Sequence, residues 1–319
     1  MKKNLLLFIV FFFLNQTGYS FAQNYPNKSI RLVVPSAAGG TLDIIARSVV
    51  QKLSESLKQP IIIDNRPGAS GIIAMDIAAK SPADGYTLVL GTSGTFAANL
   101  LSHNKLPFDI LKDFTPISII TESTFALAIH PSLQVNSLQE FTNLAKLKPN
   151  AITYGSFGVG SIAQFLTESF NLQAGIQLTH IPYKSAPDTL NGLIGGQVAA
   201  SMDALTVLLP QLKAKRIQIL AIGSNKRSLL APDIPTFSEL GYPGFTALVW
   251  YGLFAPGNTP KEIVSKLNAE ILKSLAEPET KEKLLSIGLM PIGSSPENLA
   301  QQIKMDIEKF TVVANATKI

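Results

Sequence analysis

The stretch IRLVVPSAAGGTLDIIARSVVQKL, residues 30–53, decides how this chain folds. It opens with a short apolar run, Ile30–Val34, and continues through Pro35 and two adjacent glycines. The apolar residues that follow recur every three to four positions, which predicts an amphipathic helix over residues 42–57. A strand, a glycine turn and a helix N-terminus form one βα unit. Such a turn often holds an anion, because free N–H groups and the helix dipole favour negative charge.

Strand and helix patterns alternate along the rest of the chain. Further strands are predicted at 61–64, 87–90, 117–120, 126–129, 152–154, 177–180, 198–202, 218–222 and 247–254. This alternation is typical of α/β proteins, in which helices flank mostly parallel sheets. Capping residues predict helix starts at Thr41, Ser137, Ser161, Thr259-Pro260 and Ser295-Pro296.

The alternation breaks twice, and the breaks predict where the chain crosses between two domains. Around Thr121–Phe125 two strand-like runs follow each other directly, and at Gly241–Phe245 the sequence GYPGF precedes a new apolar run. We expect a discontinuous first domain, residues 23–124 plus 246–319, and a second domain, residues 125–245. Two segments that cross between domains form a hinge beside a cleft, which suits ligand capture by closure.

The N-terminus has the pattern of a secretory signal peptide. Lys2 and Lys3 precede an apolar run, Leu5–Leu14, and Ser20 and Ala22 supply small residues for cleavage near Ala22. The run is too short to span a bilayer, which takes about 20 residues. We therefore expect residues 1–22 to be removed from an exported, periplasmic protein; an uncleaved anchor is the alternative.

Composition and motifs exclude several classes of function. The chain has no Cys and only three His, so disulfides and thiolate metal sites are ruled out. Beyond Lys2 and Lys3, its Lys and Arg form no basic stripe with interleaved aromatics, which argues against a nucleic-acid partner. Neither H-E-x-x-H nor G-x-S-x-G occurs. We expect no metal, no cofactor and no catalysis.

Three loops share one design: PSAAGGT (35–41), LGTSGTF (90–96) and YGSFGVGSIAQ (154–164). Each follows a predicted strand, contains glycines and hydroxyl side chains, and opens a helix. In open α/β sheets ligands bind outside the carboxyl ends of strands, so the three loops together predict an anion site. A dinucleotide is disfavoured, because the strand after the third loop ends in His180 and not in an acid. A small carboxylate fits better.

A series of motifs recurs here in the order of a known family. They include YPNKSIRLVVPSAAGGTLDIIAR, NRPGASG, ADGYTLVLGTSGT, LPFDILKDFTPIS, HIPYK and LGYPGF. Over essentially its whole mature length the chain resembles the Bug-type, TctC-like periplasmic receptors of tripartite tricarboxylate transporters. The resemblance implies a type II-like, two-domain periplasmic binding protein with its ligand cleft between the domains. It also implies a monomer that binds a small carboxylate and meets one large and one small membrane subunit.

The resemblance also implies which residues hold the carboxylate. They are Ser36, Ala38, Gly39 and Thr41 from the first loop, Thr92 and Ser93 from the second, and Ser156, Gly160 and Ser161 from the third. Many relatives have Phe at the position of Ser36 and His at that of Gln164. Because these residues differ, the resemblance does not identify the chemical group at the far end of the ligand.

Three charged residues have competing interpretations. Asp203 ends a predicted strand, where it could cap a helix or accept a hydrogen bond from a ligand ammonium or hydroxyl. Asp43 complements the dipole of its helix, because a position facing the cleft would repel an anionic ligand. Arg66 could pair with the ligand carboxylate, but it precedes Pro67-Gly68, where bonds to turn carbonyls are expected. Two rival functions are held as alternatives. A periplasmic hydrolase would need a base beside a cleft serine, and the sequence shows none. A receptor for a signalling partner is not distinguished from a transport receptor by sequence.

Overall fold

The computed structural model describes residues 25–102, 105–317 and 319. The predicted signal peptide, residues 1–22, lies outside the described residues. No helix of the described part is long and apolar enough to cross a membrane.

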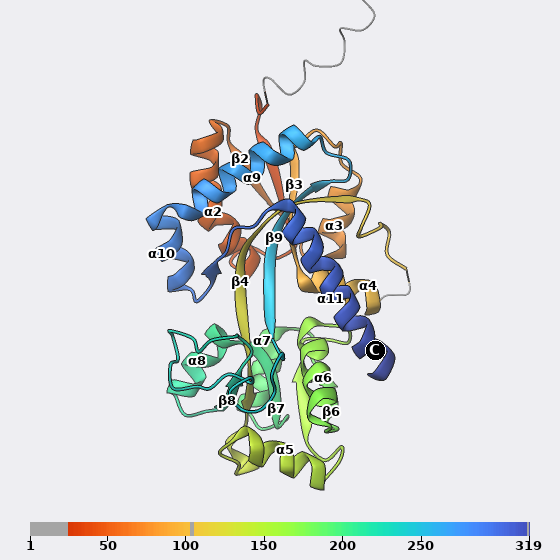
Figure 1. The fold of residues 1–319 in the computed structure, drawn as a ribbon, viewed down its shortest axis with the longest axis vertical. Helices are drawn as coiled ribbons and strands as arrows, with labels where there is room; N and C mark the ends of the chain where they lie inside the picture. The colour runs from red at the N-terminus through yellow and green to blue at the C-terminus, as the bar shows by residue number, and fades with distance from the viewer. Residues whose placement is uncertain (1–24, 103–104, 318) are drawn as a thin grey trace, which may run out of the picture.

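Ten strands of the described residues form one continuous sheet with helices on its faces (Figure 1). The strands are β1 (Ile30–Val34), β2 (Ile61–Asn65), β3 (Thr87–Thr92), β4 (Phe114–Ile129), β5 (Thr153–Ser156), β6 (Thr179–Pro182), β7 (Ala200–Ala204), β8 (Gln218–Ile222), β9 (Leu248–Pro256) and β10 (Met290–Pro291). The α-helices are α2 (Thr41–Leu57), α3 (Ile72–Ala79), α4 (Asn99–Ser102), α5 (Leu138–Leu147), α6 (Ile162–Ala174), α7 (Ala186–Ile194), α8 (Leu205–Lys213), α9 (Lys261–Ala276), α10 (Pro278–Ser286) and α11 (Pro296–Thr317). Short 3-10 turns lie at Ala69–Gly71 and Pro131–Leu133, and a π-helical turn, η2, covers Gly94–Ala98.

The sheet has two halves that share the long strand β4. The strand order is β2-β1-β3-β9-β4-β7-β5-β6, and β8 and β10 also pair with β4. Residues 114–124 of β4 pair with β9, whereas residues 125–129 pair with β7 and β8. Figure 1 shows β4 and β9 running between the two halves of the molecule. The two-domain α/β fold expected from the sequence is confirmed.

Some details of the sequence prediction were wrong. The runs at 117–120 and 126–129 are one strand and not two, because residues 121–125 stay extended and pair with β9 and β7. The two-residue strand β10 was not predicted, and its pairing depends on residues far away in the sequence. The helix α2 is capped by Gly40 and not by Thr41. The domain boundaries themselves remain a prediction.

Three backbone segments form a ring of hydrogen bonds where the two halves join. The N–H of Phe125 donates to the carbonyl of Ala247 at 2.8 Å, and the N–H of Ala247 donates to Gly223 at 2.9 Å. The N–H of Gly223 completes the ring by donating to Phe125 at 2.8 Å. A Cβ at Gly223 would lie 2.3 Å from the Cβ of Ala247 and 2.6 Å from its nitrogen. Glycine is therefore required by close packing at this ring.

The C-terminal helix α11 lies along both halves (Figure 1). Its Phe310 ring packs against Phe165 of α6, with ring centroids 5.2 Å apart. Its Asp306 accepts a hydrogen bond of 2.6 Å from the buried indole of Trp250, on β9. The helix thus connects one end of β9 with a helix of the other half.

Gly223→Ala should destabilise the protein by about 1–3 kcal/mol, because the added methyl overpacks the backbone ring. Gly195→Ala is the matched control, since a Cβ there would meet only the Asn191 carbonyl, at 3.2 Å. We expect the control to be close to neutral in urea unfolding. Equal stability of the two variants would contradict the packing argument.

Candidate functional site

Strand direction places four loops opposite one another. β1 is parallel to β3, and β3 and β4 are each antiparallel to β9, so β1, β3 and β4 run the same way. β7 is antiparallel to β4 and parallel to β5. Because β4 runs from the first half into the second, the carboxyl ends of β1 and β3 point toward those of β5 and β7. This is the edge at which α/β sheets bind ligands.

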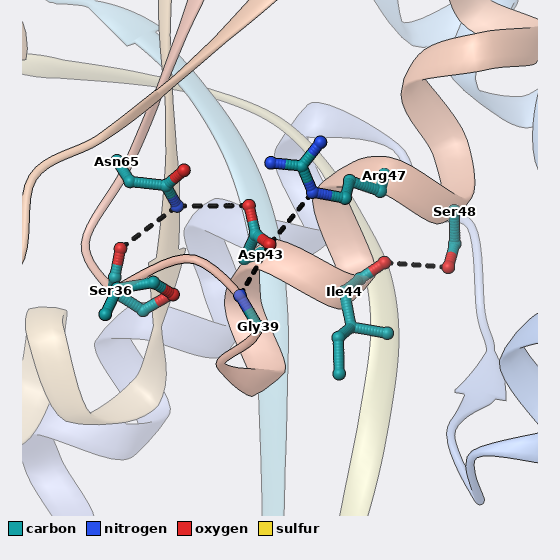
Figure 2. Close-up of polar contacts among 8 residues, drawn as sticks. Ser36, Gly39, Asp43, Ile44, Arg47, Ser48 and Asn65 are labelled. Carbon is teal, nitrogen blue, oxygen red and sulfur yellow. Dashed lines mark hydrogen bonds and ion pairs between the residues drawn. The ribbon is translucent and has the colours of Figure 1, made fainter.

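The first loop is fixed by a buried carboxylate, as Figure 2 shows. Asp43, 2% exposed, accepts hydrogen bonds from the N–H of Gly39 at 2.8 Å and from Nε of Arg47 at 2.9 Å. Asn65 donates to its other oxygen at 3.1 Å and to the carbonyl of Ser36 at 3.0 Å. The bond from Arg47 is the main cause that holds the pKa of Asp43 at about 2. Asp43 therefore shapes the loop.

The rest of this loop remains available to a ligand. Ala38, Gly39 and Thr41 are exposed, and Ser36 is half-buried. Gly39 has φ +80°, which a residue with a side chain adopts only under strain. The cap of α2, Gly40, has no side chain, so no side-chain oxygen occupies the first N–H groups of the helix.

Arg66 pairs with a carboxylate outside the three glycine loops. Its Nε donates to Asp64 at 2.9 Å, and Asp64 also accepts from Arg31 at 2.8 Å. The expected bonds from Arg66 to turn carbonyls are therefore wrong, because a carboxylate two residues earlier is the stronger acceptor.

The second loop packs beside the first. Gly71 lies between them: a Cβ there would be 2.8 Å from Thr95 and 3.2 Å from Pro35. Thr92 and Thr95 hold the turn by mutual hydrogen bonds of 2.8 and 3.1 Å. Ser93 is 1% exposed, and its hydroxyl has no partner among the described residues. A buried hydroxyl without a partner is costly, so Ser93 is a strong candidate for a ligand contact.

The third loop meets the second across the junction. A Cβ at Gly160 would lie 2.1 Å from that of Ser102 in α4, and a Cβ at Gly94 would lie 3.7 Å from Ile162. Ser161 caps α6 by accepting the N–H of Gln164 at 3.4 Å. The structure therefore brings together the first loop with the second and the second with the third.

Ser156 has a histidine neighbour that sequence reasoning missed. Its Oγ lies 2.6 Å from Nε2 of His180, which corrects the expectation that the cleft serines have no base partner. β5 and β6 are parallel neighbours, and this pairing sets the two side chains together. Burial lowers the pKa of His180 to about 4, so the ring is neutral. The Ser156 hydroxyl, fully buried, also lies 2.9 Å from the carbonyl of Gly158, a second acceptor for its single proton.

Asp203 is the last residue but one of β7, at the edge that faces β1 and β3. Its Oδ1 accepts the N–H of Ala204 at 2.7 Å, but Ala204 and not Asp203 is the cap of α8, so the capping interpretation was wrong. Its Oδ2 has no hydrogen-bond partner among the described residues, and the side chain is 4% exposed. Burial raises the pKa of Asp203 to about 6. Burial and, after it, the charge of Asp203 raise the pKa of Tyr251 on β9, and Tyr251 is in register with Thr92 at the end of β3.

A separate cavity of about 510 Å³ opens beside the junction of the halves. Residues from both halves line it, including Glu122, Leu205, Leu230 and Met290, and its walls are largely apolar. None of the residues predicted to hold the ligand lines it. Lys226 and Arg227 also line this cavity, and Arg227 is paired with Glu239. The facing loops remain the predicted carboxylate site, because the residues that the resemblance implies lie there. No cluster of three or more potential metal ligands lies within the described residues.

Asp203→Asn should raise the free energy of unfolding by up to about 3 kcal/mol at pH 8 and have little effect near pH 4. The folded-state pKa of about 6 exceeds the ordinary 3.8, so the stability contributed by this carboxyl is present below pH 3.8 and lost as the pH rises through 6. Asp43→Asn should do the opposite and destabilise at pH 8, because the pKa of Asp43 is lowered. Urea titrations at both pH values measure this; a less stable Asp203→Asn protein at pH 8 would refute it.

Comparison with known proteins agrees with this architecture. Residues 45–318 match the sequence profile of the tripartite tricarboxylate transporter family receptor. Protein BugT of Bordetella pertussis is 33% identical over 321 residues, which cover 99% of this chain and 98% of BugT.

Two solved structures are similar in sequence and in fold. An R. palustris protein solved with adipate is 36% identical, with a TM-score of 0.80 over 91% of this chain and 97% of the other. MatC from Rhodopseudomonas palustris, solved with bound malate, is 31% identical, with a TM-score of 0.77 over 91% and 99% of the two chains. The chain therefore belongs to the receptor family of the tripartite tricarboxylate transporters, a family of periplasmic solute-binding proteins that includes the Bug proteins.

Proposed function

We propose that this protein captures a small carboxylate by closing its two domains and delivers it to the large and small membrane subunits of a tripartite transporter. The observation that carries the proposal is the opposition of the carboxyl ends of β1 and β3 to those of β5 and β7 across β4. Residues 23–124 plus 246–319 would form one domain and residues 125–245 the other. Residues 1–22 would direct the chain to the periplasm and be cleaved near Ala22.

Backbone N–H groups at a helix N-terminus and side-chain hydroxyls would hold the carboxylate. The segments 35–41, 92–94 and 156–161 contain no Lys or Arg. The N-terminus of α2, without a side-chain cap, offers N–H groups to an anion, and Ser93 offers its unpartnered hydroxyl. Ser36, Ala38, Gly39, Thr41, Thr92, Ser156, Gly160 and Ser161 would complete the site. The relatives solved with adipate and malate support a small carboxylate as the ligand.

Three substitutions test this grip by calorimetry with adipate and malate. Gly39→Val should weaken binding at least about tenfold, because a β-branched residue is strained at φ +80° and the loop N–H groups move. Ser93→Ala should cost about 0.5–1.5 kcal/mol of binding free energy. Arg66→Gln is the matched control and should leave affinity unchanged. If Arg66→Gln abolishes binding in a folded protein while Gly39→Val binds normally, a dipole-based grip is wrong.

A hydrolase remains the second candidate, because His180 lies within hydrogen-bond reach of Ser156. Against it, the serine is fully buried and its hydroxyl also has the Gly158 carbonyl as an acceptor. We expect no turnover of nitrophenyl esters by the wild-type protein and intact carboxylate binding by His180→Asn. Ester hydrolysis that both Ser156→Ala and His180→Asn abolish would establish the hydrolase instead.

A further inference from the structure

The carboxylate of Asp203 is the negatively charged group at the site that lacks a full set of partners. One oxygen accepts the N–H of Ala204, whereas Oδ2 has no donor among the described residues. The side chain is 4% exposed, so bulk water does not replace the missing donor. An unsatisfied buried carboxylate oxygen is costly, and a ligand that donates to it would remove that cost.

Among the described residues, no Lys or Arg opposes the effect of burial on the pKa of Asp203. The main influence on its pKa is burial, and a backbone N–H is the one group that opposes it. Burial and, after it, the nearby Asp203 carboxylate raise the pKa of the Tyr251 hydroxyl, but this hydroxyl does not donate to Oδ2, which has no hydrogen-bond partner among the described residues. The segment that follows, residues 203–205, and the three glycine loops contain no Lys or Arg.

Ser93 and Asp203 are complementary in what they offer. Both side chains are buried, both lack a partner at one oxygen, and they stand at strand ends that face each other across β4. The hydroxyl of Ser93 can donate to a carboxylate, but an ionised Asp203 only accepts. An unsubstituted dicarboxylate has only acceptors to present to Asp203 and would bring a like charge toward it.

Building on the carboxylate-receptor function proposed above, we propose that the bound carboxylate presents a hydrogen-bond donor, a hydroxyl or an ammonium, to Asp203. The site is then selective for hydroxy- or amino-substituted carboxylates over their unsubstituted counterparts. Asp203 sets specificity, and the backbone and hydroxyl groups of the glycine loops hold the carboxylate common to all of them.

Ligand series with one carbon skeleton isolate the donor. Succinate, malate and aspartate differ only at one carbon, as do adipate, 2-hydroxyadipate and 2-aminoadipate. Calorimetry at pH 8 with each enantiomer should show the substituted members binding about 10- to 100-fold more tightly than the parent acid of the skeleton that fits. Which donor is preferred, hydroxyl or ammonium, follows from the same titrations.

Variants connect the preference to Asp203. Asp203→Leu, of similar shape, should remove it for both substituents, whereas Asp203→Asn should weaken ammonium ligands more than hydroxyl ligands, because the charge is lost and an acceptor oxygen remains. Asp233→Asn is the control: this exposed aspartate gives the same change in net charge within residues 125–245. It should retain the full preference. Thermal melts verify that each variant is folded.

The outcomes separate this inference from the function on which it rests. If the unsubstituted acids bind as tightly as their substituted partners, or if the preference survives Asp203→Leu, the role of Asp203 is wrong and the receptor function stands. If no carboxylate of either series binds the folded wild-type protein, the receptor function is wrong and this inference falls with it.

Discussion

The long strand β4 fixes how the two halves of the sheet are oriented relative to each other. Its first part pairs with β9 and its last part with β7 and β8, so a single extended segment belongs to both halves of the sheet. Antiparallel pairing on both sides of β4 orients the parallel strands of the two halves toward each other. The facing loops follow from hydrogen-bond geometry, since each parallel strand ends at the edge nearest the other half. The backbone ring of Phe125, Gly223 and Ala247 fixes the point about which these ends meet.

Two buried aspartates at this site show how environment decides the role of a carboxylate. Asp43 has an arginine, an amide and a backbone N–H around it, so it stays ionised and organises the first loop. Asp203 has a single backbone N–H and no cation beside it within the described part of the chain, and its burial raises its pKa. The first residue has all its partners within the chain, and the second leaves an oxygen for a ligand. The same side chain is thus a structural element in one loop and a candidate for recognition in another.

Much of this was predictable from the sequence because it depends on local patterns. The alternation of β-branched runs and amphipathic spacing predicted the α/β fold, and Ser137 and Ser161 were recognised correctly as helix caps. The breaks at residues 121–125 and 241–245 predict where the chain crosses between domains, and these boundaries stay a prediction. The continuity of β4 was missed, because whether an extended segment is a loop or a strand depends on partners such as β9 that are distant in sequence.

Local patterns along the chain were enough to predict the element types, the glycine loops that lack cations and, through the motifs, the family. Which side chains meet depends on the tertiary structure. The contact between Ser156 and His180, for example, arises from the register of β5 and β6. The unpartnered oxygens of Ser93 and Asp203 likewise appear only once the chain is folded. Two groups form a hydrogen bond only when folding brings them close in space. The local sequence pattern does not indicate which distant group, if any, will reach a given buried oxygen.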